Sequence, residues 1–141
     1  MKRFFNLNIL VVFFVVCACG KNVFYYSKYG DIAGVKPYVE KGDINRANTY
    51  GFTPLLIATY YGHTSLVKYL VENGAEVNRQ DNRGWTSLMY AVYYNHKEIT
   101  RILLEHNASV TLKNSEGKSA LDYAEELYSG EILDLLKKER K

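Results

Sequence analysis

A step of 33 residues organises most of this chain. Gly51, Gly84 and Gly117 lie 33 residues apart, and a set of apolar residues keeps the same spacing. The repeated apolar positions are Leu55, Leu88 and Leu121; Ala58, Ala91 and Ala124; Leu66, Ile99 and Ile132; and Leu70, Leu103 and Leu136. Self-similarity at a fixed step of this length is typical of proteins that stack one structural unit. The spacing therefore predicts a row of equivalent units.

Each unit has the pattern of two short helices. A hydroxyl residue, Thr53, Thr86 or Ser119, precedes the first helix, where its side-chain oxygen can accept a hydrogen bond from a free amide of the first turn. A turn follows at Gly62, and a second helix then carries its apolar residues on one face. The segment after the second helix has a β-branched residue between polar neighbours. We expect it to form a projecting loop that resembles a β-hairpin.

The sequence of these units resembles the ankyrin repeat. The segments that carry the resemblance are GFTPLLIATYYGH, GWTSLMYAVYYNH, VKYLVENGAEVN and ITRILLEHNASV. The resemblance covers about residues 23–141 and implies an all-α solenoid of helix-turn-helix units with projecting β-hairpin-like loops. We predict units at about 23–45 (an N-terminal cap), 46–78, 79–111 and 112–141 (a C-terminal cap). About three or more units are needed, since one unit alone cannot bury both of its helices.

The chain departs from the family at one motif. The histidine of the family's Thr-Pro-Leu-His is replaced in every copy, by Leu56, Met89 and Asp122. This replacement puts a hydrogen bond of the family in doubt, but not the fold. The last copy differs most, and its final helix carries the charged residues that a C-terminal cap requires on its outer face: Glu131, Asp134, Lys137 and Lys138.

The first 18 residues have the pattern of an export signal. Lys2 and Arg3 precede an apolar run that is unbroken from Ile9 to Ala18 and ends in small residues. A helix from Phe4 to Ala18 would cover roughly 22 Å of a hydrocarbon core that is about 30 Å thick. A signal peptide at residues 1–18 is therefore favoured over a retained membrane span.

The run Val16-Cys17-Ala18-Cys19 resembles the bacterial lipobox, in which the last cysteine is lipidated and becomes the mature N-terminus. The resemblance predicts a lipid on Cys19 as a membrane anchor, a short tether at residues 19–22, and a location in the cell envelope that faces the periplasm or the exterior. A plain signal that is cleaved after Ala18 is the alternative. Both interpretations begin the mature chain at Cys19.

The mature chain is nearly neutral. Removing Lys2 and Arg3 leaves 16 basic residues against 15 acidic ones, a net charge of +1. The one basic cluster, Lys137, Lys138, Arg140 and Lys141, complements the carbonyl end of the last helix. We therefore expect no nucleic-acid partner, and we expect a monomer. Both cysteines precede residue 20, so the repeat domain forms no disulfide within itself.

Three histidines, His63, His96 and His106, are the candidates for metal binding or acid–base chemistry. The first two occupy equivalent places in neighbouring units, and stacked helices lie about 8 to 10 Å apart, so both nitrogens would not reach a zinc ion at about 2 Å. The family resemblance implies a structural hydrogen bond for them instead. Neither a nucleophile–histidine–carboxylate pattern nor a phosphate-binding glycine run is recognisable. We predict no enzyme, no cofactor and no metal.

The thirteen tyrosines are spread unevenly within the repeat. In ankyrin proteins, the residues beside the repeat glycine and the C-terminal end of the first helix form a concave surface that holds protein partners. The resemblance implies these partner-binding residues: Tyr29, Tyr50, Phe52, Tyr60, Tyr61, Arg83, Trp85, Tyr93 and Tyr94. Their flanks are Lys28, Thr49 and Asn82, with Ser115, Glu116, Lys118, Glu126 and Leu127 at the C-terminal end. Tyr and Trp are enriched among residues that dominate binding energy.

Other interpretations of the tyrosines stay open at this point. Tyr60, Tyr61, Tyr93 and Tyr94 could pack only between helices, although the Leu, Ile and Ala positions already supply an apolar core. Aromatic rings also suit a small molecule or a glycan, but a shallow groove without convergent polar groups favours a protein. A protein-binding module of this kind could serve as an envelope scaffold, as an inhibitor or immunity protein that blocks a toxin or an enzyme, or as a host-directed factor.

Overall fold

The computed structural model describes residues 21–127 and 130–139. Its helices are α2 (Val23–Lys28), α3 (Ile32–Glu40), α4 (Pro54–Tyr60), α5 (Thr64–Glu72), α6 (Ser87–Tyr93), α7 (Lys97–Glu105), α8 (Ala120–Leu127) and α9 (Glu131–Glu139), and a 3₁₀ helix, η1 (Asp43–Asn45), follows α3. No strand occurs in these two ranges. The predicted all-α class is confirmed.

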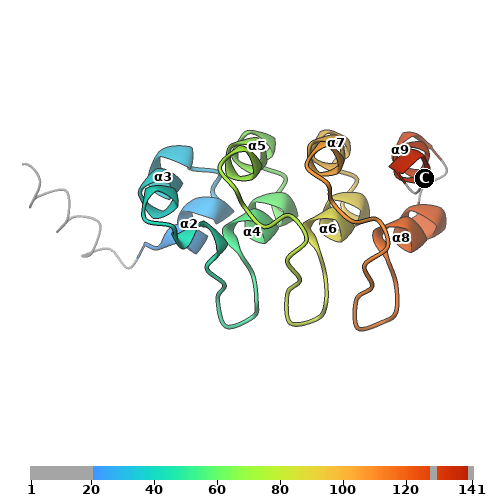
Figure 1. The fold of residues 1–141 in the computed structure, drawn as a ribbon, viewed down its shortest axis with the longest axis horizontal. Coiled ribbons are helices and arrows are strands. Elements are labelled where there is room, and N and C mark those ends of the chain that lie inside the picture. The colour runs from blue at the N-terminus through green and yellow to red at the C-terminus, as the bar shows by residue number, and fades with distance from the viewer. Residues whose placement is uncertain (1–20, 128–129, 140–141) are drawn as a thin grey trace, which may run out of the picture.

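The helices form pairs that stand side by side in one row (Figure 1). The first helices of the pairs, α2, α4, α6 and α8, lie in one layer, and the second helices, α3, α5, α7 and α9, lie in the other. Each first helix contacts the next first helix, and α5, α7 and α9 contact one another in turn. Long loops project on the side of the first layer. This arrangement is the predicted solenoid, in which each pair packs only on its neighbours.

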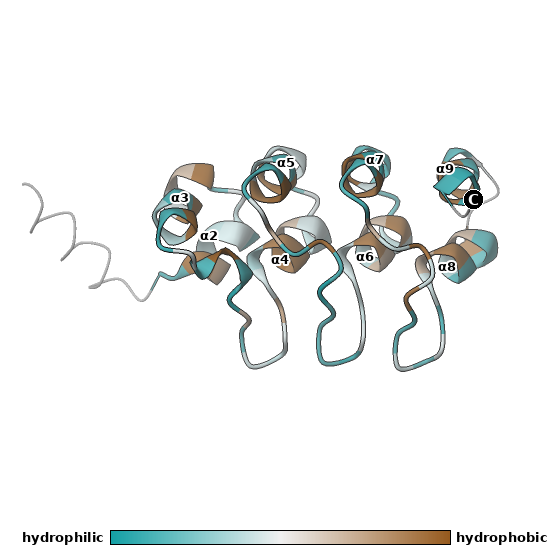
Figure 2. Ribbon diagram, viewed as in Figure 1, coloured by the Kyte–Doolittle hydropathy of each residue, from teal (hydrophilic) through white to brown (hydrophobic). Residues whose placement is uncertain are grey.

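The core runs through the row as one cluster of buried side chains. Its members include the residues that recur at the 33-residue step, such as Leu66, Leu70 and Leu103, which are all fully buried. Burying a leucine side chain stabilises a fold by about 1.5 to 3 kcal/mol. Figure 2 shows that the hydrophobic colour is concentrated on the helices, while the projecting loops are mostly pale or hydrophilic.

The first helices α4, α6 and α8 begin at the predicted hydroxyl residues, whereas Asn22 caps α2. Thr53 accepts a hydrogen bond from the Leu56 amide at 3.3 Å, and Thr86 accepts one from the Met89 amide at 3.2 Å. The reciprocal bond, from the backbone amide of the capping residue, goes to the side chain that replaces the family histidine. Met89 Sδ accepts it at 3.5 Å from Thr86, whereas the apolar side chain of Leu56 has no acceptor to offer.

The projecting loops are tight turns that touch each other, and no strand forms in the described residues that build them. Gly51 and Gly84 both have a positive φ, of 81° and 77°. A Cβ at Gly51 would lie 2.7 Å from the backbone nitrogen of Asn82, and that nitrogen donates to the Tyr50 carbonyl at 3.1 Å. The repeat glycine is therefore required both by its backbone conformation and by the close approach of the next loop.

Several predicted features lie at the ends of the chain. The signal peptide at 1–18, Cys19 and the basic residues Arg140 and Lys141 fall outside the described residues. Among the residues that are described, no helix is long and apolar enough to cross a membrane. At the other end, α9 carries Glu131 in its first turn and Lys137 in its last turn, which is the polarity that the helix dipole favours.

Candidate partner-binding surface

Most of the predicted binding residues are exposed on the side of the first helices and loops. Tyr29, Tyr50, Tyr60, Tyr61, Tyr93 and Tyr94 each expose between 36% and 71% of their surface. Arg83 is exposed and Phe52 is partly buried. Tyr60 and Tyr61 end α4 and begin its turn, and Tyr93 and Tyr94 occupy the same places at α6. The two pairs therefore recur at equivalent positions of neighbouring repeats.

These four tyrosines form one cluster, which we call the tyrosine cluster (Tyr60, Tyr61, Tyr93 and Tyr94). The ring of Tyr60 lies 5.1 Å from that of Tyr61 and 5.0 Å from that of Tyr94, between centroids, and Tyr93 lies 5.2 Å from Tyr94. All three contacts are edge-to-face, an arrangement that aromatic quadrupoles favour. The hydrogen bond with Tyr60 and partial burial raise the pKa of Tyr94 to about 12, so the Tyr94 hydroxyl is uncharged at neutral pH.

Two histidines stack on rings of the tyrosine cluster. The imidazole of His63 stacks on Tyr61 with centroids 6.3 Å apart, and that of His96 stacks on Tyr94 at 6.1 Å. His63 Nε2 also lies 2.7 Å from the Lys28 carbonyl, so this histidine makes the predicted structural hydrogen bond to the preceding helix pair. His96 Nε2 is buried and has no hydrogen-bond partner among the described residues. The two equivalent histidines therefore differ.

Trp85 was predicted to lie on the exposed surface, but the structure buries it. Only 8% of its surface is exposed. Its ring lies 4.9 Å from that of Tyr90 and 4.9 Å from that of Tyr123, between centroids, and the Arg83 guanidinium lies above it at 5.8 Å. The indole thus fills the space between the loop and the first helices of two repeats. We therefore assign Trp85 to packing and leave it out of the proposed contact surface.

A buried polar network that was not predicted from the sequence lies beneath the loops. The Tyr90 hydroxyl donates to Asp81 Oδ2 at 2.6 Å and accepts from Arg83 Nη2 at 3.0 Å. Burial and the hydrogen bond to Asp81 raise the pKa of Tyr90 well above its ordinary value. Tyr90 and Tyr123 lie 33 residues apart and each follows a polar residue, Asp81 or Asn114, by nine residues. That shared spacing was the available signal.

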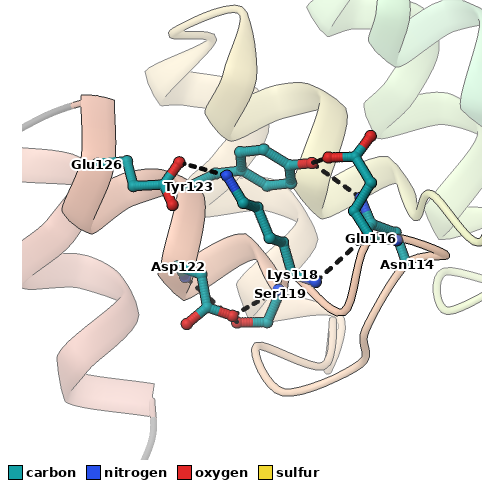
Figure 3. A network of polar contacts seen from close by, with 7 residues as sticks. All are labelled: Asn114, Glu116, Lys118, Ser119, Asp122, Tyr123 and Glu126. Carbon is teal, nitrogen blue, oxygen red and sulfur yellow. Dashed lines mark hydrogen bonds and ion pairs between the residues drawn. The ribbon is translucent and has the colours of Figure 1, made fainter.

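The predicted surface ends in the last repeat with charged groups that pair among themselves (Figure 3). Tyr123 accepts a hydrogen bond from Asn114 Nδ2 at 2.8 Å and donates one to Glu116 Oε2 at 3.3 Å. Lys118 Nζ lies 2.7 Å from Glu126 Oε2. Exposed ion pairs of this kind contribute little to stability, because solvent screens them. This end therefore contributes mainly charged groups, beside the exposed side chain of Leu127.

An aromatic cleft lies at the opposite end of the surface. Its volume is about 480 Å³, and it opens between α2, α4 and the loop that precedes α4. The rings that line it include Phe24, Tyr25, Phe52, Tyr60 and Tyr61, and the cations Lys28 and Arg83 complete the wall. Across the described residues, no group of three or more His, Cys, Asp or Glu is placed to hold a metal ion.

Comparison with protein families decides which class of repeat this is. The family model described as ankyrin repeats (3 copies) matches residues 23–114 and, in an overlapping match, residues 82–141. The chain belongs to the ankyrin-repeat family. A comparison with curated proteins found no match.

Ankyrin repeats generally mediate protein–protein interaction without catalysis. In this ankyrin-repeat chain, the exposed tyrosines lie at the loop and helix-end positions for which the family resemblance implies partner contacts. The matched range also contains the cleft and both polar networks. The surface therefore has the large, rigid, partly polar contact area that suits recognition of another protein.

Proposed function

We propose that this chain is a non-catalytic binding module that holds a protein partner on the surface centred on the tyrosine cluster. The observation that carries the proposal is that four tyrosines of two adjacent repeats touch edge to face while each exposes between 36% and 46% of its surface. Rings that already hold one another in place lose little side-chain entropy on binding. Exposed tyrosines that can bury their faces on a partner are common binding hot spots.

Crosslinking tests this proposal. A photoreactive phenylalanine at position 93 should form an adduct with one protein when it is placed in the native cell envelope. The Tyr94→Ala substitution in the same chain should weaken binding of that protein by roughly 1 to 3 kcal/mol, because it removes a ring from the centre of the surface. Lys68→Ala on α5 is the matched control, since its exposed ion pair with Glu72 lies on the other layer. Equal adduct yield for Tyr94→Ala and the control would contradict the proposal.

We also propose that the chain acts as a monomer that is exported and tethered to a membrane by a lipid on Cys19. The lipobox-like run and the basic, apolar N-terminus support this location. Several acyl chains, at roughly 0.8 kcal/mol per buried methylene, would anchor the protein firmly. Cys19→Ser should move the protein from the membrane fraction to the soluble fraction, with Cys17→Ser as the control. Unchanged membrane attachment of Cys19→Ser would contradict lipidation.

A further inference from the structure

The aromatic cleft differs from the rest of the surface in its charge. Its wall holds two positive charges, from Lys28 and Arg83, beside five rings that supply apolar area: Phe24, Tyr25, Phe52, Tyr60 and Tyr61. The described lining contains no carboxylate. A wall of rings and of cations that have no carboxylate within salt-bridge distance favours a ligand that combines an apolar group with a negative charge.

Neither cation lies within salt-bridge distance of a carboxylate in the described part of the chain, although the Tyr90 hydroxyl links Arg83 to Asp81. Lys28 Nζ lies 5.6 Å from the centroids of Tyr29 and Tyr61 and forms no ion pair with a described residue. Arg83 donates one of its five N–H groups to the Tyr90 hydroxyl, and its guanidinium is exposed. By contrast, Lys36 and Lys68 on the second layer each lie within 4.0 Å of a glutamate. The two cleft cations therefore keep donors available for an incoming anion.

The charge at the opposite end of the surface argues against a polyanion as the occupant. Glu116 and Glu126 are exposed there, and Glu126 forms an ion pair with Lys118. A nucleic acid or another uniform polyanion that lay along the whole surface would meet these carboxylates. A protein segment with one localised acidic group meets only the cleft. The charge distribution therefore favours a peptide over a polyanion.

We infer that the aromatic cleft binds an acidic segment of the protein partner. The carboxylate of an Asp or Glu pairs with Lys28 and Arg83, and an aromatic or leucine side chain next to it packs against Phe52 and Tyr60. This inference rests on the proposed function, because it assigns the chemistry of the partner on the same surface. The guanidinium of Arg83 is already oriented by Tyr90, so it can meet a carboxylate with a planar pair of N–H groups.

Selection of peptides tests the inference. The full chain, kept in detergent micelles, is presented with random peptides of about twelve residues on phage, and the enriched peptides are measured by fluorescence anisotropy. We expect them to carry Asp or Glu within a few residues of an aromatic or leucine. Replacing that acid by its amide should weaken binding about tenfold, since charged hydrogen bonds are roughly twice as strong as neutral ones. Enrichment of neutral or basic peptides, or of none, would overturn the inference.

Charge reversal separates a direct contact from an indirect one. Lys28→Glu should weaken binding of the acidic peptides at least about tenfold and should improve binding of the same peptides with Lys in place of the acid. Lys36→Glu on α3 is the control and should change neither affinity. If circular dichroism shows that Lys28→Glu fails to fold, Lys28→Gln takes its place. It should weaken binding of the acidic peptides without improving binding of the peptides that carry Lys. Unchanged affinity of the folded variant for the acidic peptides would show that the cleft is not their binding site.

The inference and the proposed function fail in different ways. A crosslinked partner that needs Tyr94 but binds Lys28→Glu as tightly as the unchanged chain would keep protein binding and reject the acidic segment. Loss of the partner from both variants would support both. Displacement of the selected peptide by an equal concentration of benzoate would reject a protein segment as the occupant, because the cleft would then prefer a small aromatic anion.

Discussion

The loops around Gly84 and Gly117 share one backbone design but carry opposite charges at the residue before the glycine, Arg83 in one and Glu116 in the other. In the first loop, Asp81 Oδ1 accepts hydrogen bonds from the backbone amides two and four residues later, at 2.8 and 2.9 Å. In the second, Asn114 Oδ1 accepts the equivalent two bonds, both at 3.0 Å. A carboxylate and an amide oxygen therefore close the same turn equally well, and the difference between the repeats begins at the other atom of each side chain.

That other atom sets the direction of a buried hydrogen-bond chain. Asp81 Oδ2 can only accept, so the Tyr90 hydroxyl donates to it and receives a bond from Arg83. Asn114 Nδ2 can only donate, so the Tyr123 hydroxyl receives its bond and donates to Glu116. The outer residue changes from a cation to an anion where the inner one changes from an anion to a neutral amide, and this places Arg83 beside the cleft and Glu116 at the C-terminal end.

Trp85 and Lys118 occupy the same position of these two loops, and their substitution should show the largest difference. Trp85→Ala removes a ring that packs between two tyrosines, and we expect it to lower the free energy of unfolding by about 3 to 5 kcal/mol. Urea unfolding followed by circular dichroism measures this change. If Trp85→Ala does not fold, Trp85→Phe keeps an aromatic ring, as at the equivalent Phe52, and should cost less than about 2 kcal/mol.

The same variant separates packing from binding. A folded Trp85→Phe chain should capture the crosslinked partner as well as the unchanged chain, because only 8% of the indole surface is available for contact. A loss of partner binding at full stability would return Trp85 to the contact surface and would make the loop itself part of the recognition site.

Reversing the hydrogen-bond chain of the first loop tests whether its direction matters for stability. Asp81→Asn alone presents two donors, Asn Nδ2 and Arg83, to the Tyr90 hydroxyl, whose own proton then has no acceptor. We expect a loss of about 1 to 2 kcal/mol in the free energy of unfolding. The double variant Asp81→Asn, Arg83→Glu copies the arrangement of Asn114 and Glu116 and should recover most of that loss. Each stability is measured by urea unfolding at one salt concentration.

The double-mutant cycle needs a second reference. Arg83→Glu alone should be destabilising, because the new carboxylate then faces Asp81 across the tyrosine. The sum of the two single losses should therefore exceed the loss in the double variant. If the two losses were strictly additive, the residues at positions 81 and 83 would not be coupled. The pairing of Asp81 with Arg83 would then have no energetic basis.

Sequence reasoning recovered the features that depend on one position at a time. The 33-residue step placed Gly51 and Gly84 in loops and Leu66 and Leu103 in the core, because backbone conformation and apolar burial repeat with the unit. It also placed Tyr60 and Tyr94 at the exposed ends of first helices. The burial of Trp85 did not follow from this pattern, because it depends on rings from the next helix and the next repeat.

The hydrogen-bond networks could be predicted from the repeat pattern only in part. The spacing of Asp81 to Tyr90 and of Asn114 to Tyr123 is visible in the sequence, but the proton direction requires the side-chain geometry. The aromatic cleft is a still larger assembly, since Lys28 and Arg83 come from repeats that are separated by more than one full step. Features built from three elements were therefore found in the structure alone.

A smaller difference between the two repeats lies at the third residue of the first helix, Met89 in α6 and Asp122 in α8. Asp122 Oδ2 accepts bonds from the Ser119 amide and hydroxyl at 2.7 Å, and these bonds hold the pKa of Asp122 below its ordinary value of 3.8. The stabilisation is therefore fully present above about pH 4 and is lost as the pH falls through the folded-state pKa. Asp122→Asn should cost on the order of 1 kcal/mol at neutral pH.

The pH dependence checks that assignment. Thermal unfolding between pH 2 and pH 7 should show a gap between the unchanged chain and Asp122→Asn that closes below about pH 4. Met89→Leu should run parallel to the unchanged chain throughout this range, because its sulfur does not titrate. A gap that persists at pH 2 would mean that shape, rather than charge, is what Asp122 contributes.

Lys118 should give the smallest effect, although it stands where Trp85 stands. Its ammonium pairs with Glu126 at the surface and lies 5.4 Å from the centroid of the Tyr123 ring, so water screens both interactions. We expect Lys118→Ala to shift the urea midpoint less than any other variant here, and 0.5 M NaCl should remove that shift. The loss in Trp85→Ala should remain in salt, because burial rather than charge produces it. A salt-insensitive loss in Lys118→Ala would show that the aliphatic stem packs as the indole does, and that the two loops differ in charge but not in core.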